Sequence, residues 1–88
     1  MLDFTIIWDL DEDPDGNVAH CAEHDVTKDE VEEVFENASD ADVSRSSGRP
    51  VIFGDTSSGR YLMIVFETID ADMIYPITAY DVPRRHRS

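Results

Sequence analysis

Two histidines near residue 20 have the spacing of a zinc-peptidase motif. The run His20-Cys21-Ala22-Glu23-His24 fits H-x-x-E-H, and on a helix this spacing places both imidazoles on one face, as zinc requires. A peptidase also needs a third ligand from elsewhere and a substrate cleft, for which a chain of 88 residues has little room. We interpret both histidines, with Asn17, as an exposed polar face, and we expect no metal centre and no cofactor.

Aspartates alternate along the loop before that helix, at Asp9, Asp11, Asp13 and Asp15, and Gly16 follows them. If Asp11 were the first position of an EF-hand loop, the twelfth would have to be a bidentate glutamate, and it is an alanine. A proline in the loop stiffens it, and no helix is expected before it. The pattern indicates weak cation binding at most, and the alternative is a solvated acidic loop.

Cys21 stands beside the histidines, and a thiol next to an imidazole suggests a nucleophile. On a helix, however, Cys21 shares the apolar face with Val18 and Ala22, where burial raises the pKa of a thiol and makes it unreactive. We therefore expect a core residue. Because it is the only cysteine, an internal disulfide is excluded and a cytoplasmic location is expected.

The arginines and tyrosines form the one set that could meet RNA, because an arginine fork binds phosphate and tyrosine stacks on bases. Six arginines occur in the second half of the chain, with the three tyrosines on expected strands. The candidate RNA-binding residues are Arg45, Arg49, Tyr75, Arg84 and Arg85. Exposed arginines at strand ends are also ordinary in proteins that bind no nucleic acid.

The charge distribution argues against RNA over the first half. Twenty acidic residues face seven basic ones, which gives a net charge of −13. Residues 1–42 hold fifteen of the acids and one base, whereas residues 43–88 hold five acids and six arginines. A polyanion would be repelled by the first half and tolerated by the second. Thirteen aspartates and one lysine also suit a salt-adapted organism, in which an acidic surface says nothing about partners.

Two helices are expected in the first half, after a strand over residues 4–8. The first covers residues 17–24. Thr27 and Glu30 form a capping box that begins the second, which ends between residues 37 and 40. The residues that the second helix should bury, at spacings of three and four, are Val31, Val34, Phe35 and Ala38.

The second half is rich in strands, expected at residues 42–46, 51–55, 60–67 and 73–80. The third of these is apolar on both faces and therefore central. Pro76 predicts an edge position or a bulge in the last. No apolar run is long enough to span a bilayer, and no secretory signal is visible. The order β-α-α-β-β-β predicts one α+β domain over residues 1–88, with both helices on one face of an antiparallel sheet of four to five strands and a basic mobile tail over residues 83–88.

Several short motifs follow one another in the order found in a known family. They are Ile7-Trp8-Asp9, His24-Asp25-Val26-Thr27, Glu32-Glu33-Val34-Phe35, Ser58-Gly59-Arg60-Tyr61-Leu62, Ile77-Thr78-Ala79 and the basic C-terminus. Over about residues 4–85 the chain resembles the BrnT ribonuclease toxins, the toxin halves of type II toxin–antitoxin pairs. The resemblance implies a RelE-like fold, which agrees with the predicted order of elements. It also implies RNA cleavage and a tightly bound cognate antitoxin.

The chain departs from the family at polar positions. Before the second helix the family has Asn-x-x-Lys-His-Gly-Val. The corresponding polar positions hold His20, Glu23, His24 and Asp25, of which His24 alone matches, and Glu23 replaces the lysine. On the last strand Tyr80 stands where the family carries an arginine, and Tyr75 stands at a second basic position. These substitutions remove positive charge from the place where RNA would lie.

Metal-free RNA cleavage needs a base, a cation at the phosphorane and an acid at the leaving oxygen. In the first hypothesis His24 is the base or acid, Arg60 or Arg49 holds the phosphate, and Tyr80 donates a hydrogen bond. This makes the chain a metal-independent endoribonuclease, with His24, Arg60 and Tyr80 catalytic, neutralised by an antitoxin that uses basic residues. The alternative is a diverged, non-catalytic interaction domain, which the net charge, Glu23, Tyr75 and Tyr80 favour.

Overall fold

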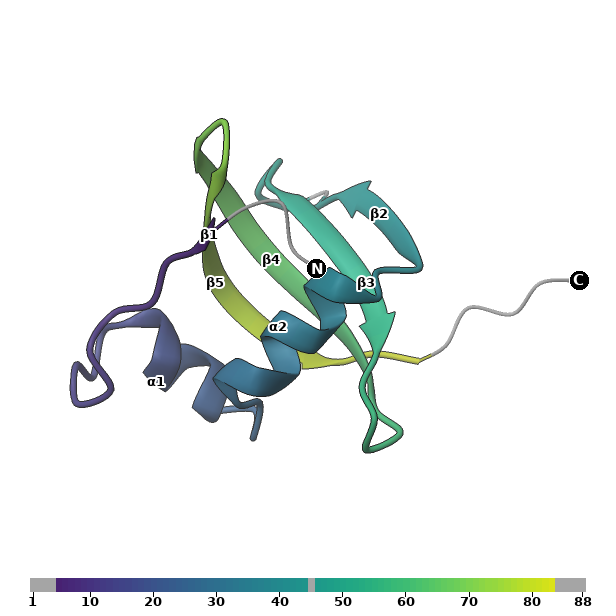
Figure 1. Cartoon of the computed structure of the whole chain (residues 1–88), viewed down its shortest axis with the longest axis horizontal. Coiled ribbons are helices and arrows are strands. Elements are labelled where there is room, and N and C mark those ends of the chain that lie inside the picture. Colours follow the sequence, from purple (N-terminus) through teal and green to yellow (C-terminus); the bar gives the residue numbers. More distant parts are fainter. Residues whose placement is uncertain (1–4, 45, 84–88) are drawn as a thin grey trace, which may run out of the picture.

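The computed structural model describes residues 5–44 and 46–83. They form a five-stranded mixed sheet with two helices packed against it (Figure 1). The elements in chain order are β1 (Thr5–Ile6), α1 (Asn17–Ala22), α2 (Lys28–Glu36), β2 (Asp40–Val43), β3 (Pro50–Asp55), β4 (Tyr61–Asp70) and β5 (Met73–Asp81). The predicted α+β class is confirmed. No helix among these residues is long and apolar enough to cross a membrane.

The sheet has the strand order β1-β5-β4-β3-β2, so β4 is central as predicted. β2 to β5 are antiparallel to their neighbours, but β1 runs parallel to β5. The expectation of a wholly antiparallel sheet was therefore wrong. The alternation of side chains shows which residues share a face, but it does not show which strand a terminal segment joins or in which direction.

Pro76 ends the pairing of β1 with β5. Thr5 N donates to Asp72 O at 2.7 Å and Ile7 N donates to Ile74 O at 2.8 Å. In a parallel ladder the next bond would come from the N–H of residue 76, and proline has none. The strand expected over residues 4–8 is consequently only two residues long within the described part.

Asn17 takes the place of the missing bond. Its Nδ2 donates to Ile7 O at 3.0 Å and to Pro76 O at 2.8 Å, while its Oδ1 accepts from Asp9 N at 3.0 Å. The side chain is completely buried, so its expected place on an exposed polar face was wrong. Burial is tolerated because each polar atom has a partner.

Pro76 also marks the predicted bulge. Val65 pairs with Thr78, whereas the next residue of β4, Phe66, pairs with Pro76, which leaves Ile77 as the extra residue of β5. The proline is thus accommodated by a bulge on one side of β5 and by the Asn17 side chain on the other.

The core lies between the helices and one face of the sheet. It is formed by Cys21, Val26, Val31, Val34, Ile52, Leu62, Ile64, Phe66 and Ala79, with Trp8, Phe35 and Ile74 packed against it. α2 lies close to β3 at Gly54, where a Cβ atom would be only 3.1 Å from Val34 Cγ1. The capping box and the burial of Val31 and Val34 are confirmed. Phe35 is only partly buried against the core, and Ala38 lies beyond the helix end and is exposed.

Two other boundaries differ from the prediction. α1 ends at Ala22, so His24 lies in the connection to α2 rather than on the helix. The weak strand expected over residues 42–46 begins and ends earlier, as β2 (Asp40–Val43). Residues 84–88 of the predicted basic tail lie outside the described residues.

Candidate functional site

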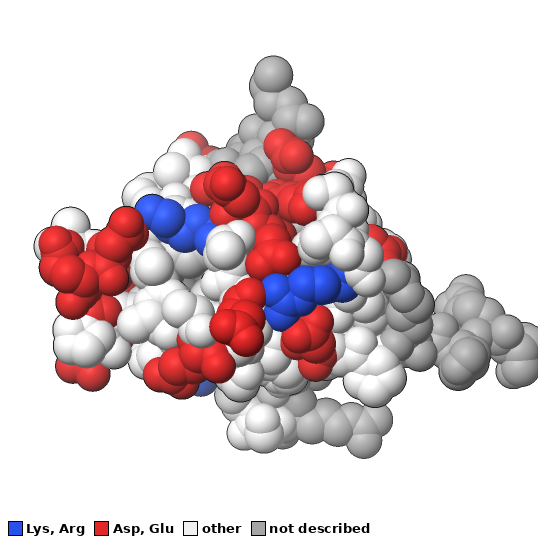
Figure 2. All heavy atoms as spheres, turned by 90° about the horizontal axis from the view of Figure 1, so that it is seen from below, with Lys and Arg blue, Asp and Glu red and all other residues white. Residues whose placement is uncertain are grey.

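Acidic side chains dominate the face in Figure 2, and each visible basic group is bordered by acids. The described residues contain nineteen aspartates and glutamates but three lysines and arginines. Lys28 Nζ lies 3.0 Å from Asp11 Oδ1, Arg49 Nε lies 3.7 Å from Glu67 Oε2, and Arg60 contacts two carboxylates. Each described cation is therefore already paired within the chain.

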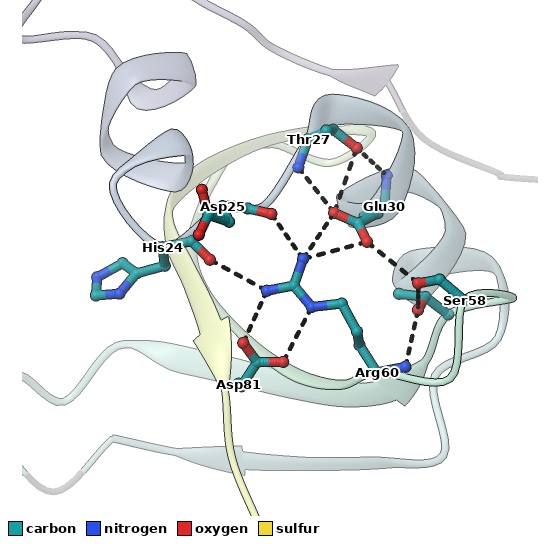
Figure 3. Close-up of polar contacts among 8 residues, drawn as sticks. His24, Asp25, Thr27, Glu30, Ser58, Arg60 and Asp81 are labelled. Carbon is teal, nitrogen blue, oxygen red and sulfur yellow. Dashed lines mark hydrogen bonds and ion pairs between the residues drawn. The ribbon is translucent and has the colours of Figure 1, made fainter.

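Arg60 is the last residue of the connection between β3 and β4, and all five N–H groups of its guanidinium have partners (Figure 3). Nε donates to Asp81 Oδ1 at 3.0 Å and Nη2 donates to Asp81 Oδ2 at 2.7 Å, a bidentate pair. Nη1 donates to Glu30 Oε1 at 3.0 Å and to Asp25 O at 2.6 Å, and Nη2 donates to His24 O at 3.1 Å. No N–H of this guanidinium is left for a phosphate in this geometry.

Two of those bonds, to Asp25 O and His24 O, lie at the C-terminal end of helix α1. Asp25 has a φ of 60°, and the N–H groups of Val26 and Asp25 donate to Cys21 O and Ala22 O at 3.0 and 2.9 Å. This is a Schellman motif with an aspartate in the left-handed position, and Val26 packs with Cys21 in the core. The Arg60 guanidinium binds the carbonyls of His24 and Asp25, just beyond the helix, where a cation also complements the helix dipole.

Glu30 connects the same arginine to the start of α2. Its side chain accepts from Thr27 N at 3.1 Å, and Glu30 N donates to Thr27 Oγ1 at 3.2 Å, which completes the capping box. Oε2 also accepts from Ser58 Oγ at 3.4 Å in the β3–β4 turn. Arg60 and Glu30 therefore join the end of one helix, the beginning of the next and a hairpin.

Electrostatics hold this cluster in its ionised form. The bond to Asp81 raises the pKa of Arg60 above its ordinary value. Glu30 raises it further, whereas desolvation of the guanidinium lowers it. The bond from Arg60 lowers the pKa of Asp81. The Arg60 and Glu30 side chains are only 23% and 19% exposed, whereas that of Asp81 is 60% exposed. The Arg60–Glu30 pair is therefore the better shielded one.

His24 and Tyr80 lie together as the ribonuclease hypothesis expects, with ring centroids 5.5 Å apart and a tilt of 47°. The Arg60 guanidinium contacts the backbone carbonyl of His24, while the imidazole points away from it (Figure 3). The three predicted catalytic residues are thus neighbours in space. The cation among them, however, faces Asp81 and Glu30 rather than the two rings.

The other candidates fall elsewhere or are not described. Arg49 lies at the open end of the β3–β4 hairpin, opposite the turn that carries Arg60, and it pairs with Glu67. Tyr75 lies beside Glu67 in the sheet register, so it belongs to that end as well. Arg45, Arg84 and Arg85 lie outside the described residues.

Tyr75 is engaged by the acidic loop. Its hydroxyl donates to Asp9 Oδ2 at 2.5 Å, and the same oxygen accepts from Asn17 N at 2.9 Å. The bond to Asp9, with desolvation, raises the pKa of Tyr75 to about 12. Bonds from Tyr75 and from the Asn17 backbone lower the pKa of Asp9.

The remaining aspartates of the loop also face different partners. Asp13 Oδ1 accepts from Asp15 N at 2.9 Å, and Asp11 Oδ1 accepts from Lys28 Nζ at 3.0 Å. Within residues 5–44 and 46–83, no three histidine, cysteine or acidic side chains are grouped as a metal ion would require. This applies to the loop and to the H-x-x-E-H run alike.

Cys21 is buried, as the sequence predicts, and desolvation raises the pKa of its thiol to about 11. The sequence analysis missed the Glu30–Arg60–Asp81 cluster and the buried Asn17. The capping box gave Glu30 a local role, but no local pattern connects it with an arginine thirty positions later.

Comparison of the chain with models of protein families, with curated proteins and with solved structures found no match.

Proposed function

We propose that the protein is a non-catalytic interaction domain that binds a protein partner through the partner's basic surface. The observation that carries this proposal is the charge arrangement: every described lysine and arginine is already paired with a carboxylate, and acids outnumber them nineteen to three. A surface of this kind accelerates association with a cationic partner and disfavours a polyanion.

The resemblance to the BrnT family gives the partner its class: a small basic antitoxin-like protein, bound in the cytoplasm. The fold and partner surface are kept in this proposal, and RNA cleavage is lost. The use of Arg60 supports the loss, because binding a phosphate would require the guanidinium to leave two carboxylates and two helix-terminal carbonyls.

The first test is RNA cleavage by the purified, partner-free protein on a mixed RNA substrate at several salt concentrations. We expect none, from the unaltered chain or from His24→Ala and Tyr80→Phe. The second test mixes the protein with the product of the adjacent reading frame and measures the Kd by calorimetry. We expect a complex that weakens steeply as salt rises, because charge pairing is screened.

Ribonuclease activity is the second candidate, and the His24–Tyr80 ring contact at 5.5 Å favours it. It needs a phosphate-binding cation other than the engaged Arg60. Cleavage by the folded protein that both His24→Ala and Tyr80→Phe abolish would replace our proposal with this one. Absence of both cleavage and binding would leave salt adaptation as the explanation of the charge.

A further inference from the structure

We infer that Asp40 and Asp42 protect the outer edge of β2, the last strand in the order of the described sheet, from pairing with a second copy of the chain. β2 (Asp40–Val43) is the last strand of the sheet order, and of the described strands only β3 pairs with it (Figure 1). An edge strand offers unpaired N–H and C=O groups to other chains, and proteins block this in identifiable ways.

The register shows which groups face outward. Ser44 N donates to Arg49 O at 2.7 Å, so the hydrogen-bonded positions alternate from there along β2. Val43 then lies opposite Pro50, which has no N–H, and Ala41 lies opposite Ile52, both at non-hydrogen-bonded positions. The N–H groups of Ala41 and Val43 therefore point away from β3.

Both outward N–H groups are bound by the side chain of the preceding residue. Ala41 N donates to Asp40 Oδ1 at 2.9 Å, and Val43 N donates to Asp42 Oδ1 at 2.8 Å. These are the donors that an added strand would have to use. An incoming strand must first break both bonds, and its carbonyl oxygens would approach two carboxylates.

The β2 strand would be prone to pair with another chain if its outward N–H groups were not bound. With a period of two, Ala41 and Val43 share one face, and Val43 is 58% exposed. Once its donors were released, β2 would present an apolar face together with an open edge. A second copy is the occupant that this arrangement excludes, because its own β2 carries the same complementary edge.

The test compares two double variants that lose the same charge. Asp40→Ala with Asp42→Ala removes the bound oxygens, whereas Asp40→Asn with Asp42→Asn keeps an Oδ1 acceptor at each position. Hydrogen exchange of the Ala41 and Val43 amides is followed by NMR, corrected for intrinsic rates. Sedimentation is measured in about 1 M NaCl, where salt screening shortens the range of charge repulsion between copies to about 3 Å.

We expect the alanine variant to exchange both amides at least tenfold faster and to self-associate as its concentration rises. The asparagine variant should keep its protection and remain monomeric. A matched control is Asp70→Ala with Asp72→Ala, which removes two charges and the same kind of bond, from Ala71 N to Asp70 Oδ1 at 2.7 Å, in a turn rather than at an edge. It should remain monomeric.

Two results would overturn the inference. The alanine variant, folded by circular dichroism, could stay monomeric with slowly exchanging amides, and the bonds from Ala41 N and Val43 N to the two aspartates would then have no role in protecting the edge. Equal self-association of the alanine and asparagine variants would show that charge, rather than the hydrogen bonds, keeps the edge free.

Discussion

At the scale of single residues, Arg60 shows how an amino acid suited to phosphate binding can be committed to structure. Its fork fits Asp81 in the bidentate manner that would fit a phosphate, and its remaining N–H groups meet Glu30 and the end of α1. In this structure the N–H groups of Arg60 are used by Asp81, by Glu30 and by the carbonyls at the end of α1, so none is left to bind a phosphate.

We expect Arg60→Ala to lower the free energy of unfolding by about 2–4 kcal/mol, because it leaves Glu30 and two helix-terminal carbonyls without their donor. Arg60→Lys should recover only part of this loss, since an ammonium cannot reproduce the fork. Urea unfolding measures both. Arg49→Ala is the matched control: its pair with Glu67 is 3.7 Å long and exposed, so a loss below about 0.5 kcal/mol is expected. Equal losses at the two arginines would contradict the structural role of Arg60.

The Asp9–Tyr75 bond predicts a pH dependence. The pKa of Asp9 is lowered on folding, so its contribution is present at neutral pH and is lost as pH falls through that lowered value. The pKa of Tyr75 is raised to about 12, so its contribution is present below about pH 10 and is lost as pH rises through 12.

Tyr75→Phe should therefore destabilise the protein at pH 7, and progressively less as the pH falls through the lowered pKa of Asp9. Urea unfolding of both proteins across this range gives the difference. In an Asp9→Asn background the tyrosine substitution should cost less at pH 7, since the charged acceptor is gone. The loss of stability caused by Tyr75→Phe could instead be independent of pH, or be as large in the Asp9→Asn background. Either result would exclude the Asp9–Tyr75 bond as the source of the loss.

At the scale of elements, the connection between α1 and α2 relies on one residue in an unfavourable conformation. Asp25 adopts a φ of 60°, which glycine occupies without steric cost. Glu23, two residues earlier, has an ordinary helical φ of −59°. The same substitution should thus have opposite effects at the two positions.

We expect Asp25→Gly to raise the free energy of unfolding by about 0.5–1 kcal/mol and Glu23→Gly to lower it by about 1 kcal/mol. Asp25→Val should be destabilising, because a branched Cβ fits the left-handed region poorly. Thermal unfolding of the three variants gives the order. A loss of stability for Asp25→Gly would mean that the carboxylate matters more than the backbone conformation.

The junction of β1, α1 and β5 depends on Asn17. Asn17→Leu keeps the volume but removes the bonds to Ile7 O and Pro76 O and the acceptor for Asp9 N. Because these groups lie at a buried site, we expect a loss of about 2–4 kcal/mol in urea unfolding. Asn37→Leu, at the exposed end of α2, is the control and should change stability by less than about 0.5 kcal/mol. A small effect at Asn17 would show that water replaces its bonds.

Across the whole molecule, the excess of acids disfavours the folded state, and in the proposed function it selects a basic partner. With a net charge of −13 on 88 residues, repulsion between carboxylates opposes the compact form. Screening by salt should relieve it. The interaction proposal and salt adaptation both predict this effect, and they differ in whether a basic partner binds at low salt.

Raising NaCl from about 0.1 to 1 M should stabilise the protein by on the order of 1 kcal/mol, or about 4–8 °C in Tm for a domain of this size. Glu12→Gln with Glu36→Gln removes two exposed charges and should reduce this salt response. Calorimetric scans of both proteins provide the comparison. A Tm that does not depend on salt would show that repulsion is negligible.

Features that depend on near neighbours along the chain could be predicted from the residue types alone. Thr27 and Glu30 are three residues apart, so the start of α2 follows from their types. The buried Val31 and Val34, the buried Cys21, the central strand and the bulge at Pro76 likewise follow from periodicity or from one residue's covalent geometry.

Features that depend on residues far apart along the chain could be established only from the fold. The direction of β1 depends on β5, the burial of Asn17 depends on carbonyls at positions 7 and 76, and the use of Arg60 depends on residues 24, 25, 30 and 81. A hydrogen bond forms between groups that are close in space, and spacing along a chain predicts closeness only within one helix or strand. The pairing of Arg60, on which the functional conclusion depends, therefore had to come from the fold.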